Sequence, residues 1–296
     1  MKFGVALPNF GRYARKDAIL KVAKTAEALG FDSLWVSDHI VMPKSHQGFG
    51  DVFYEPLTTL TYMAACTDKV HLGISVIILP YRNPIVLAKM LSTLDVLSGG
   101  RVIAGVGVGW LKDEFDALGA SYEKRAPITD ECIEVLKALW TKEEPSFKGR
   151  YYRFSEIKFF PRPIQKPHPP VWVGGNSRRA IERAVNVGDG WHPVGLTPEE
   201  MKEEVRYVNE LLAGKGKKTS DFVISLRKNL QIKSASDNKR IGDKEILRGT
   251  PDKIAEGIER YRESGVSHLV FQILSGTLEG VVETMEIFSR DIRPAL

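Results

Sequence analysis

The sequence alternates between short apolar runs and longer amphipathic stretches along its whole length, and this alternation restricts the chain to few folds. The predicted strands lie at 3–7, 33–38, 70–79, 101–107, 170–174, 189–194, 222–232 and 267–273. The predicted helices follow them in turn at 17–29, 56–67, 84–97, 124–141, 177–187, 197–212, 251–264 and 277–289. Serial strand–helix pairs predict a parallel sheet covered by helices, and this number of pairs suits a closed (β/α)8 TIM barrel better than a doubly wound sheet. No break in composition divides residues 1–296, so we expect a single α/β domain with insertion loops.

The composition argues against several classes of protein. Hydrophobic residues make up 43% of the chain and charged residues 27%, which is ordinary for a globular protein with a full core. The formal net charge of +5 is spread along the chain, whereas a nucleic-acid binder concentrates its Lys and Arg residues on one face. No apolar run has the length of a membrane span, and the sequence begins directly with a strand. We therefore expect a cytoplasmic protein with a small-molecule substrate and no nucleic-acid or membrane partner.

Three longer segments interrupt the alternation, at 40–55, 142–169 and 233–250. The middle segment is rich in aromatic residues and proline, and we expect a small hairpin in it with Gly149 and Arg150 at the turn. Loops of this size on a barrel commonly form the walls or lid of a pocket.

The C-terminal ends of the strands carry the active site in a (β/α)8 barrel, so the residues there are the first functional candidates. The second strand runs into Asp38 and His39, a pair that can anchor a ligand and move a proton near neutral pH. In the alternative interpretation, Asp38 caps the following loop and His39 only packs; position at a strand end favours the functional one. The third strand is nearly all apolar and is interrupted by Ser75, which either bonds to backbone or marks a distorted peptide beside a ligand.

The fourth strand ends in the glycine-rich segment GVGVGWLKDEF at 105–115. Its glycines lack the final spacing of the dinucleotide fingerprint, and the segment lies in the middle of the chain, so we exclude a Rossmann site. Alternating glycines, including Gly107 and Gly109, remove side chains from one face of the strand and would let a flat ring rest against the backbone. We expect Asp113 and Glu114, a few residues past the strand end, to be solvated.

The fifth strand runs into the stretch PVWVGGNSRRAIERA at 170–184, which has the features of a phosphate site. The candidate residues are Gly174, Gly175, Asn176, Ser177, Arg178 and Arg179. Glycines let a ligand approach closely, and backbone N–H groups at a helix start favour an anion. The alternative is an ordinary tight turn in which Ser or Asn caps the helix. That interpretation does not explain the two glycines or the two arginines in the first helical turn. The sixth strand ends at Trp191 and His192, and we expect His192 to contact the same ligand.

The sequence lacks an obvious catalytic nucleophile. It contains no Ser-His-Asp spacing, no P-loop and no cluster of metal-ligand residues, and Cys66 and Cys132 have no partner at metal-binding distance along the chain. This absence favours a bound cofactor that carries the chemistry, and we expect no metal.

Several stretches resemble, in order, the bacterial-luciferase-like family, and within it the members that use the deazaflavin coenzyme F420. The stretches are FGVALPNFG, AEALGFDSLWVSDHIVMP, LDVLSGGRVIAGVGVGWLKDEFDALG, ALWTKEEPSFKGRYYRF and PHPPVWVGGNSRRAIERAVNVGDGWHP. Together they span most of residues 1–195. The resemblance implies a TIM-type barrel that holds the cofactor at its C-terminal mouth, and a homodimer, because relatives are commonly dimers.

The resemblance also implies roles for single residues. His39 would lie beside the reactive ring, with Asp38 in contact with the cofactor. The bond between Ser75 and Val76 would be a non-prolyl cis peptide that forms a bulge against the back of the ring. The further cofactor contacts that it implies are Gly107 and Gly109 along the cofactor, and Gly174, Gly175, Asn176 and Ser177 at its phosphate; Arg178 or Arg179 would lie near an anionic tail.

One departure from the family pattern concerns the substrate. Relatives that oxidise a sugar phosphate carry a proton-donating Glu directly after the fourth-strand glycines, and this chain has Trp110 there. We therefore do not expect sugar-phosphate oxidation by that route, and we place Trp110 in the wall of the substrate pocket.

The expected reaction is hydride transfer between F420 and a small organic substrate, with His39 transferring a proton and Asp38 orienting it. Two alternatives stay open. An FMN-dependent monooxygenase fits the same barrel, since both cofactors have a tricyclic ring and a phosphate, and a non-catalytic protein would bind the cofactor without turnover. A metal-dependent hydrolase would need more strand-end ligands than Asp38, His39 and His192.

Overall fold

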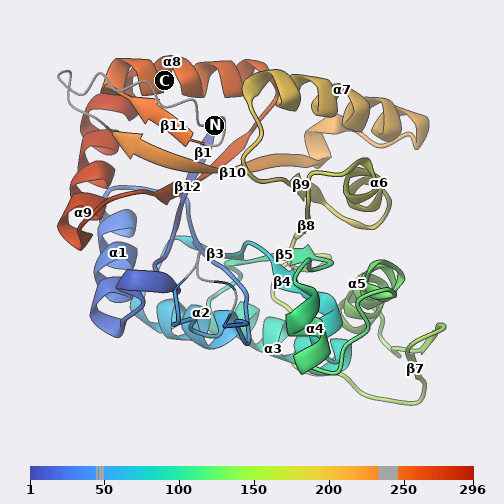
Figure 1. The fold of residues 1–296 in the computed structure, drawn as a ribbon. Coiled ribbons are helices and arrows are strands. Elements are labelled where there is room, and N and C mark those ends of the chain that lie inside the picture. Colours follow the sequence, from blue (N-terminus) through green and yellow to red (C-terminus); the bar gives the residue numbers. More distant parts are fainter. Residues whose placement is uncertain (45, 47–49, 233–245) are drawn as a thin grey trace.

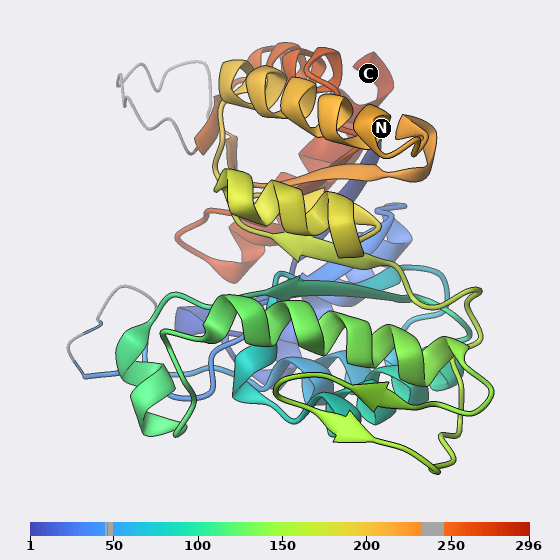
Figure 2. The ribbon, with the colours of Figure 1, turned by 90° about the vertical axis from the view of Figure 1, so that its right-hand side faces the viewer.

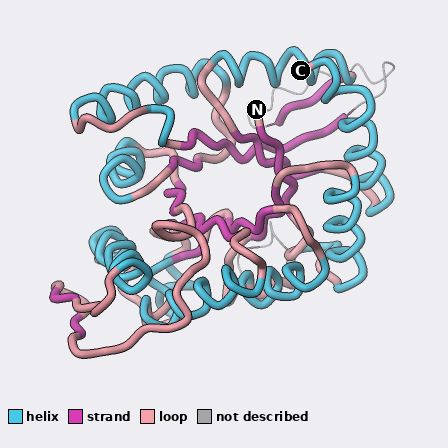
Figure 3. The backbone as a smooth tube through the Cα atoms, turned by 180° about the vertical axis from the view of Figure 1, so that it is seen from behind, coloured by secondary structure: helices cyan, strands magenta, loops and turns pink. Residues whose placement is uncertain are grey.

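The protein folds into a closed barrel of parallel strands surrounded by helices, which confirms the predicted (β/α)8 architecture (Figures 1 and 3). The computed structural model describes residues 1–44, 46, 50–232 and 246–296. The expected pocket-wall loops at 40–55 and 233–250 therefore lie partly outside the described residues. Among the described residues, no helix has both the length and the apolar character needed to cross a membrane.

The barrel positions are occupied in chain order. The strands are β1 (Lys2–Ala6), β2 (Ser33–Val36), β3 (His71–Ile74) with β4 (Ile77–Ile78), β5 (Val102–Gly107), β8 (Val171–Gly174), β9 (Gly190–His192), β10 (Val223–Ile232) and β12 (His268–Ile273). The last pairing, between β9 and β10, sets Val223 opposite Gly190 and closes the barrel. Because all these pairings are parallel, the C-terminal ends of the strands meet at one mouth.

Helices cover the outside of the barrel in the predicted order. They are α1 (Lys16–Ala28), α2 (Pro56–Cys66), α3 (Pro84–Leu97), α5 (Arg125–Thr141), α6 (Arg178–Val187), α7 (Pro198–Gly214), α8 (Pro251–Glu263) and α9 (Leu278–Ile287). Short 3-10 turns lie at Gly11–Tyr13, Leu79–Tyr81, Thr219–Asp221 and Arg293–Ala295, and a π-helical turn lies at Phe288–Ile292. The start of α7 has the cap that its sequence indicates, since the Thr197 and Glu200 side chains each accept the other's backbone N–H.

Elements outside the repeating pattern include one that was predicted and two that were not. The hairpin of β6 (Phe147–Lys148) and β7 (Arg153–Phe154) is present, with the expected turn at Gly149 and Arg150, and lies on the outside of the barrel beside α5 (Figure 2). Helix α4 (Lys112–Ala117) and strand β11 (Ile246–Gly249), which pairs with β10, were not expected.

The predicted third strand is broken in two at the Ser75–Val76 bond. That bond is a cis peptide, as the family resemblance implies. On either side of it, both β3 and β4 pair with β5, so the interruption displaces the chain locally without opening the barrel.

The barrel interior has its own small apolar cluster, separate from the larger core between sheet and helices. It is formed by Trp35, Ile103, Trp172 and Val270. Trp35 is fully buried, and a Cβ at Gly73 would lie 2.5 Å from Trp35 Cε3, so only glycine leaves room for the indole ring. The barrel interior is therefore a packed core, and a ligand site is expected at the mouth.

Candidate cofactor and active site

The mouth of the barrel brings together residues from five neighbouring strands. Asp38 and His39 follow β2, the Ser75–Val76 bond separates β3 from β4, and Gly107 ends β5. The other predicted residues come from the ends of β8 and β9. The strand-end residues predicted from the sequence therefore lie together at the mouth of the barrel.

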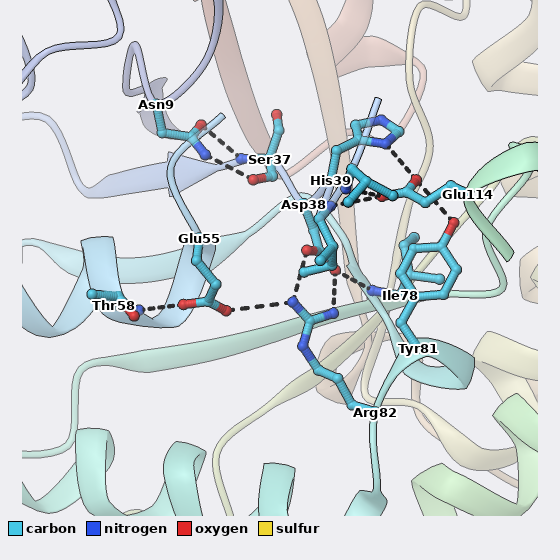
Figure 4. Close-up of polar contacts among 12 residues, drawn as sticks. Asn9, Ser37, Asp38, His39, Glu55, Thr58, Ile78, Tyr81, Arg82 and Glu114 are labelled. Atoms are coloured by element: carbon cyan, nitrogen blue, oxygen red, sulfur yellow. Dashed lines mark hydrogen bonds and ion pairs between the residues drawn. The ribbon is translucent and has the colours of Figure 1, made fainter. Parts of the chain in front are cut away.

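His39 is held by a buried carboxylate, that of Glu114. His39 Nδ1 lies 2.7 Å from Glu114 Oε2, and the same carboxylate accepts hydrogen bonds from Tyr81 Oη at 3.0 Å and from the backbone N–H of Ile40 at 2.6 Å and of Val41 at 3.2 Å (Figure 4). A carboxylate can only accept here, so Nδ1 carries the proton of this hydrogen bond.

Glu114 corrects a sequence expectation, because it is fully buried and not solvated. Helix α4 begins soon after β5 and buries Glu114 and Phe115, together with Leu111 just before the helix. Burial by itself raises the pKa of Glu114, but the hydrogen bonds from His39 and the backbone N–H groups outweigh it and hold this pKa below its ordinary value. The helical spacing of these residues was the signal in the sequence that could have revealed the buried position.

Asp38 has a different partner from the one expected. Its carboxylate accepts two hydrogen bonds from Arg82, at 2.7 and 2.8 Å, and one from the backbone N–H of Ile78 at 2.8 Å (Figure 4). Arg82 also reaches Glu55 at 3.4 Å. Asp38 therefore fixes the chain just after the cis peptide, and the prediction that it orients His39 is wrong because Glu114 does so.

Val76 forms the centre of the bulge at the mouth. A Cβ on either Gly107 or Gly174 would collide with the Val76 side chain. These two glycines thus make room for the Val76 side chain. They do not leave an open strand face against which a flat ring could rest, as the sequence analysis expected. A flat ring would instead meet the Val76 bulge itself.

His192 lies inside the barrel below this bulge. Its Nε2 is 2.8 Å from Ser75 Oγ, its Nδ1 is 2.9 Å from Ser225 Oγ, and its ring stacks on Trp35 with the centroids 4.9 Å apart. Burial, with smaller contributions from the charges of Arg227 and His268, lowers the pKa of His192 to about 3. Because serines bind both ring nitrogens, His192 is not placed for the expected direct contact with the cofactor. It supports Ser75 from inside the barrel.

Arg227 on β10 is a second support for the bulge, and sequence reasoning missed it. Its Nη1 donates to the Ser75 carbonyl at 3.1 Å and to Ser37 Oγ at 2.9 Å, and its Nη2 donates to Gln272 at 2.5 Å. Burial lowers the pKa of Arg227 to about 10, which leaves it cationic at neutral pH. The signal in the sequence was the pair of basic residues Arg227 and Lys228 in the middle of a strand that begins and ends with apolar residues.

The loop between β8 and α6 contains the residues predicted to hold a phosphate. Gly175 has φ of +123°, a conformation that glycine adopts readily, and Ser177 Oγ caps the helix by accepting the Ala180 N–H. Asn176 fixes the loop through two hydrogen bonds with the backbone of Val194, at 2.8 and 3.0 Å. The first backbone N–H groups of α6 therefore point out of its N-terminus at the mouth, where an anion is favoured.

Arg178 does not serve this loop as expected. Its guanidinium lies 3.4 Å from Glu203 and 3.8 Å from Glu204 of α7, and it stacks over the Tyr207 ring. Both arginines at the helix start are exposed. The contact of Arg178 with a cofactor tail is thus not supported by its position.

Trp110 stands at the mouth with 51% of its surface exposed, and its ring centroid is 6.1 Å from that of His39. This position suits the expected place in a substrate wall. Among the described residues, no group of His, Cys, Asp or Glu side chains is arranged to hold a metal ion.

Comparison with known proteins identifies the family. Residues 1–235 match the family model of luciferase-like monooxygenases. The chain is 32% identical over 200 residues to the FMNH2-dependent dimethylsulfone monooxygenase of Pseudomonas putida, covering 66% of this chain and 53% of that protein. It is 28% identical over 320 aligned positions to the F420-dependent glucose-6-phosphate dehydrogenase of Amycolatopsis mediterranei, covering 94% of each chain.

The fold comparison agrees. The crystal structure of the monooxygenase RslO1 from Streptomyces bottropensis superposes with a TM-score of 0.88 over 99% of both chains at 24% sequence identity. The fold is the TIM barrel of these proteins, and the relatives above are named for FMNH2 or for F420. This chain belongs to the luciferase-like monooxygenase family.

Proposed function

We propose that this protein is an F420-dependent oxidoreductase that transfers a hydride between the deazaflavin ring and a small organic substrate. The observation that carries the proposal is the buried Glu114–His39 pair, which sets a proton-transferring group at the mouth beside the Val76 bulge. The choice of F420 is supported by a relative that is named for this cofactor and aligns along 94% of both chains.

The residues of the mouth fit such a cofactor. The Val76 bulge would support the back of the ring, and the loop from Gly175 to Ser177 with the N-terminus of α6 would hold its phosphate. Asp38 and Arg82 brace the bulge from one side, and Arg227 from another. When bound, F420 supplies the hydride donor or acceptor.

The protein's own contribution is positioning and proton transfer. His39 exchanges a proton with the substrate oxygen at Nε2, while Glu114 holds Nδ1–H and stabilises the imidazolium that forms. The buried carboxylate also fixes the ring orientation, which is the role originally expected of Asp38.

Cofactor titration tests this proposal. F420 and FMN are each added to the purified protein while ring absorbance and fluorescence are followed, and we expect saturable binding of F420. The Gly175→Ala variant, strained at φ of +123°, should bind F420 about tenfold more weakly, whereas Gly214→Ala, where an added Cβ meets no atom within 4 Å, should bind normally. Tight FMN binding without F420 binding would overturn the choice of cofactor.

An FMN-dependent monooxygenase is the second candidate, favoured by the 32% identity to the P. putida enzyme. It predicts oxygen consumption when reduced FMN and substrate are mixed with the protein. A non-catalytic cofactor-binding protein predicts instead that no substrate changes the redox state of the bound cofactor.

The resemblance to dimeric relatives also leads us to propose a homodimer. Sedimentation equilibrium measures the assembly directly. A mass close to the 33.1 kDa of one chain at micromolar concentration would contradict the dimer.

A further inference from the structure

The guanidinium of Arg227 lies in the barrel mouth and is hydrogen-bonded only to uncharged groups of the described residues. Its Nη1 donates to Ser37 Oγ at 2.9 Å and to the Ser75 carbonyl at 3.1 Å, and its Nη2 donates to Gln272 Oε1 at 2.5 Å. A cation that is largely removed from water is costly unless an anion lies beside it. The charge of Arg227 therefore requires an explanation beyond its support of the bulge.

Arg101 shows how a structural arginine in this protein is satisfied. Its side chain donates to five oxygens, which belong to Ala64, Thr67, Val70 and Ser98. Several of these are at the C-terminal end of α2, where the helix dipole is negative. A guanidinium has five N–H groups, and the three partners of Arg227 leave some of them unused. In the part of the chain that the structure describes, Arg227 Nε makes no hydrogen bond, so Arg227 has donors left for a ligand.

Two amide side chains lie next to Arg227 in the mouth. Asn229 is two residues further along β10 and shares its inward side, and it is paired in register with Gln272 of β12. A guanidinium can only donate, so the Gln272 oxygen faces Arg227 and the NH2 group of Gln272 is directed elsewhere. Asn229 is partly exposed and also carries an NH2 group. We name Arg227, Asn229 and Gln272 the donor cluster, because together they offer N–H groups and one positive charge.

Carboxylates on the elements around the donor cluster form ion pairs of their own. These pairs are Asp17 with Arg15, Asp38 with Arg82, Glu199 with Arg260 and Glu279 with Lys21. Burial lowers the pKa of Arg227, and no described carboxylate raises it again, so none lies close enough to act as its counterion. The donor cluster thus keeps a positive charge that a bound monoanion would neutralise.

The donor cluster lies across the barrel from the Val76 bulge. In the order of strands around the barrel, β10 is halfway round from β3, and the Arg227 side chain crosses to Ser75. The loop expected to hold the cofactor phosphate follows β8, on a different part of the rim. A cofactor ring that rests on the bulge would therefore leave Asn229 and Gln272 to the molecule on its other side, which is the substrate.

We infer that the substrate carries a carboxylate group and that the donor cluster binds it. This inference rests on the proposed function, because the position of the cofactor ring decides which molecule meets the cluster. The two oxygens of a carboxylate match the planar fork of a guanidinium, and its single charge matches that of Arg227. A phosphate monoester has about two negative charges near neutral pH, and one of them would stay without a counterion here.

Calorimetric titration with hexanoate and hexanamide tests the carboxylate without turnover. The two probes share one apolar chain and differ in the charge of the head group. At constant ionic strength, hexanoate should bind at least about tenfold more tightly than hexanamide, both with and without bound F420. Hexyl phosphate is the third probe and compares a dianion with the carboxylate.

Three variants locate the binding site. Arg227→Gln should weaken hexanoate binding at least about tenfold, and by a larger factor than it weakens binding of hexyl phosphate. Asn229→Leu keeps Arg227 and its contacts with the bulge, and should weaken hexanoate binding about threefold. The control is Arg178→Gln, which removes an exposed arginine paired with Glu203 at the start of α6 and should change nothing. Circular dichroism confirms that the variants are folded.

Gln272→Glu supplies the missing counterion within the protein. The new carboxylate replaces an amide that already contacts Arg227, so the midpoint of thermal unfolding should rise by about 2–4 °C and the preference for hexanoate over hexanamide should disappear. A lower midpoint would show that the charge of Arg227 was already balanced, and would overturn the inference.

The outcomes also separate this inference from the proposed function. Equal binding of hexanoate and hexanamide, or hexanoate binding that neither Arg227→Gln nor Asn229→Leu weakens, overturns the donor cluster as a carboxylate site. A larger loss for hexyl phosphate than for hexanoate in Arg227→Gln overturns the carboxylate. Hexanoate binding that disappears when F420 saturates the protein assigns the cluster to the cofactor and overturns the substrate carboxylate. Arg227-dependent hexanoate binding by a protein that does not bind F420 supports the cluster and overturns the proposed function.

Discussion

The barrel interior and the barrel mouth both contain a histidine among aromatic and hydroxyl groups, but they hold it differently. In the interior, His192 is stacked on Trp35 and bonded only to neutral serines, and burial lowers its pKa to about 3. At the mouth, the His39 ring is bordered by Phe53 and Trp110 and bonded to a buried carboxylate.

The partner of the ring therefore distinguishes the two roles. A histidine held by serines inside a packed barrel stays neutral and acts as a structural support. A histidine held by a carboxylate keeps one nitrogen protonated and its ring in a fixed orientation, which suits proton transfer. The contrast is open to direct tests, because each histidine can be changed while the other is kept.

The largest expected effect is on turnover after His39→Gln. Glutamine cannot exchange a proton, so kcat/KM should fall about a thousandfold, while the affinity for F420 changes by less than about threefold. Stopped-flow measurement of F420 oxidation or reduction with an organic substrate gives the first value, and fluorescence titration gives the second. A turnover loss under tenfold would place proton transfer on another residue.

Glu114→Gln should have the next largest effect. The amide fills the same space but no longer stabilises an imidazolium, so kcat/KM should fall about a hundredfold. Tyr81→Phe removes one hydrogen bond to the same carboxylate and keeps the His39–Glu114 pair, so it should reduce turnover far less.

The pH dependence of stability gives Glu114→Gln a second measurement. The pKa of Glu114 is lowered in the folded state, so its carboxylate stabilises the fold above its ordinary pKa, and this contribution is lost as the pH falls through the lowered value. Urea unfolding from pH 6 to pH 3 should therefore be less pH-dependent in Glu114→Gln than in the wild type. An unchanged pH dependence would contradict the ionised, hydrogen-bonded carboxylate.

His192→Gln should act on stability and much less on proton transfer. Loss of the stacked ring and its two serine contacts should lower the free energy of unfolding at neutral pH by about 2 kcal/mol. The pKa of His192 is 6.5 in the unfolded chain and about 3 in the folded one. Between these two pH values, residue 192 is protonated in the unfolded chain and neutral in the folded chain. Stability therefore falls as the pH decreases, by about 1.4 kcal/mol per pH unit for this one group, and the variant should lack that portion of the slope.

Ser225→Ala is the matched control for this interior histidine. It removes one hydrogen bond to Nδ1 and keeps the buried imidazole, so the unfolding free energy should fall less and the pH slope should remain. If His192→Gln abolished turnover at unchanged stability, the division between interior and mouth would be wrong.

The fold followed from the sequence because strand and helix periodicity are local properties. Every predicted strand and helix of the barrel is present, and the resemblance located the Ser75–Val76 cis peptide. The assignment of His192 failed because side-chain direction at a strand end is hard to predict. Successive residues of a strand point to opposite sides, so a shift of one position decides whether His192 faces a ligand or the interior.

The missed residues share a different cause. Glu114, Arg82 and Arg227 reach the mouth through partners that lie far away in the sequence, such as His39 at a separation of 75 residues from Glu114. Residue spacing within one segment does not predict which carboxylate or guanidinium from a distant segment will form a hydrogen bond with it. For the same reason, Arg178 was assigned to the cofactor although α7 supplies its carboxylate partners.

The smallest expected effect tests the boundary between the two regions, at Gly107. A Cβ there would collide with Val76, so Gly107→Ala must displace the bulge and should lower the free energy of unfolding by about 1–3 kcal/mol. It should also weaken F420 binding, because Val76 is the surface against which we expect the ring to rest. Gly276→Ala, where an added Cβ meets no atom within 4 Å, should alter neither thermal unfolding nor F420 titration by more than the error. If Gly107→Ala destabilised the fold but bound F420 normally, the bulge would be a feature of the interior alone, and the cofactor ring would have to be supported elsewhere at the mouth.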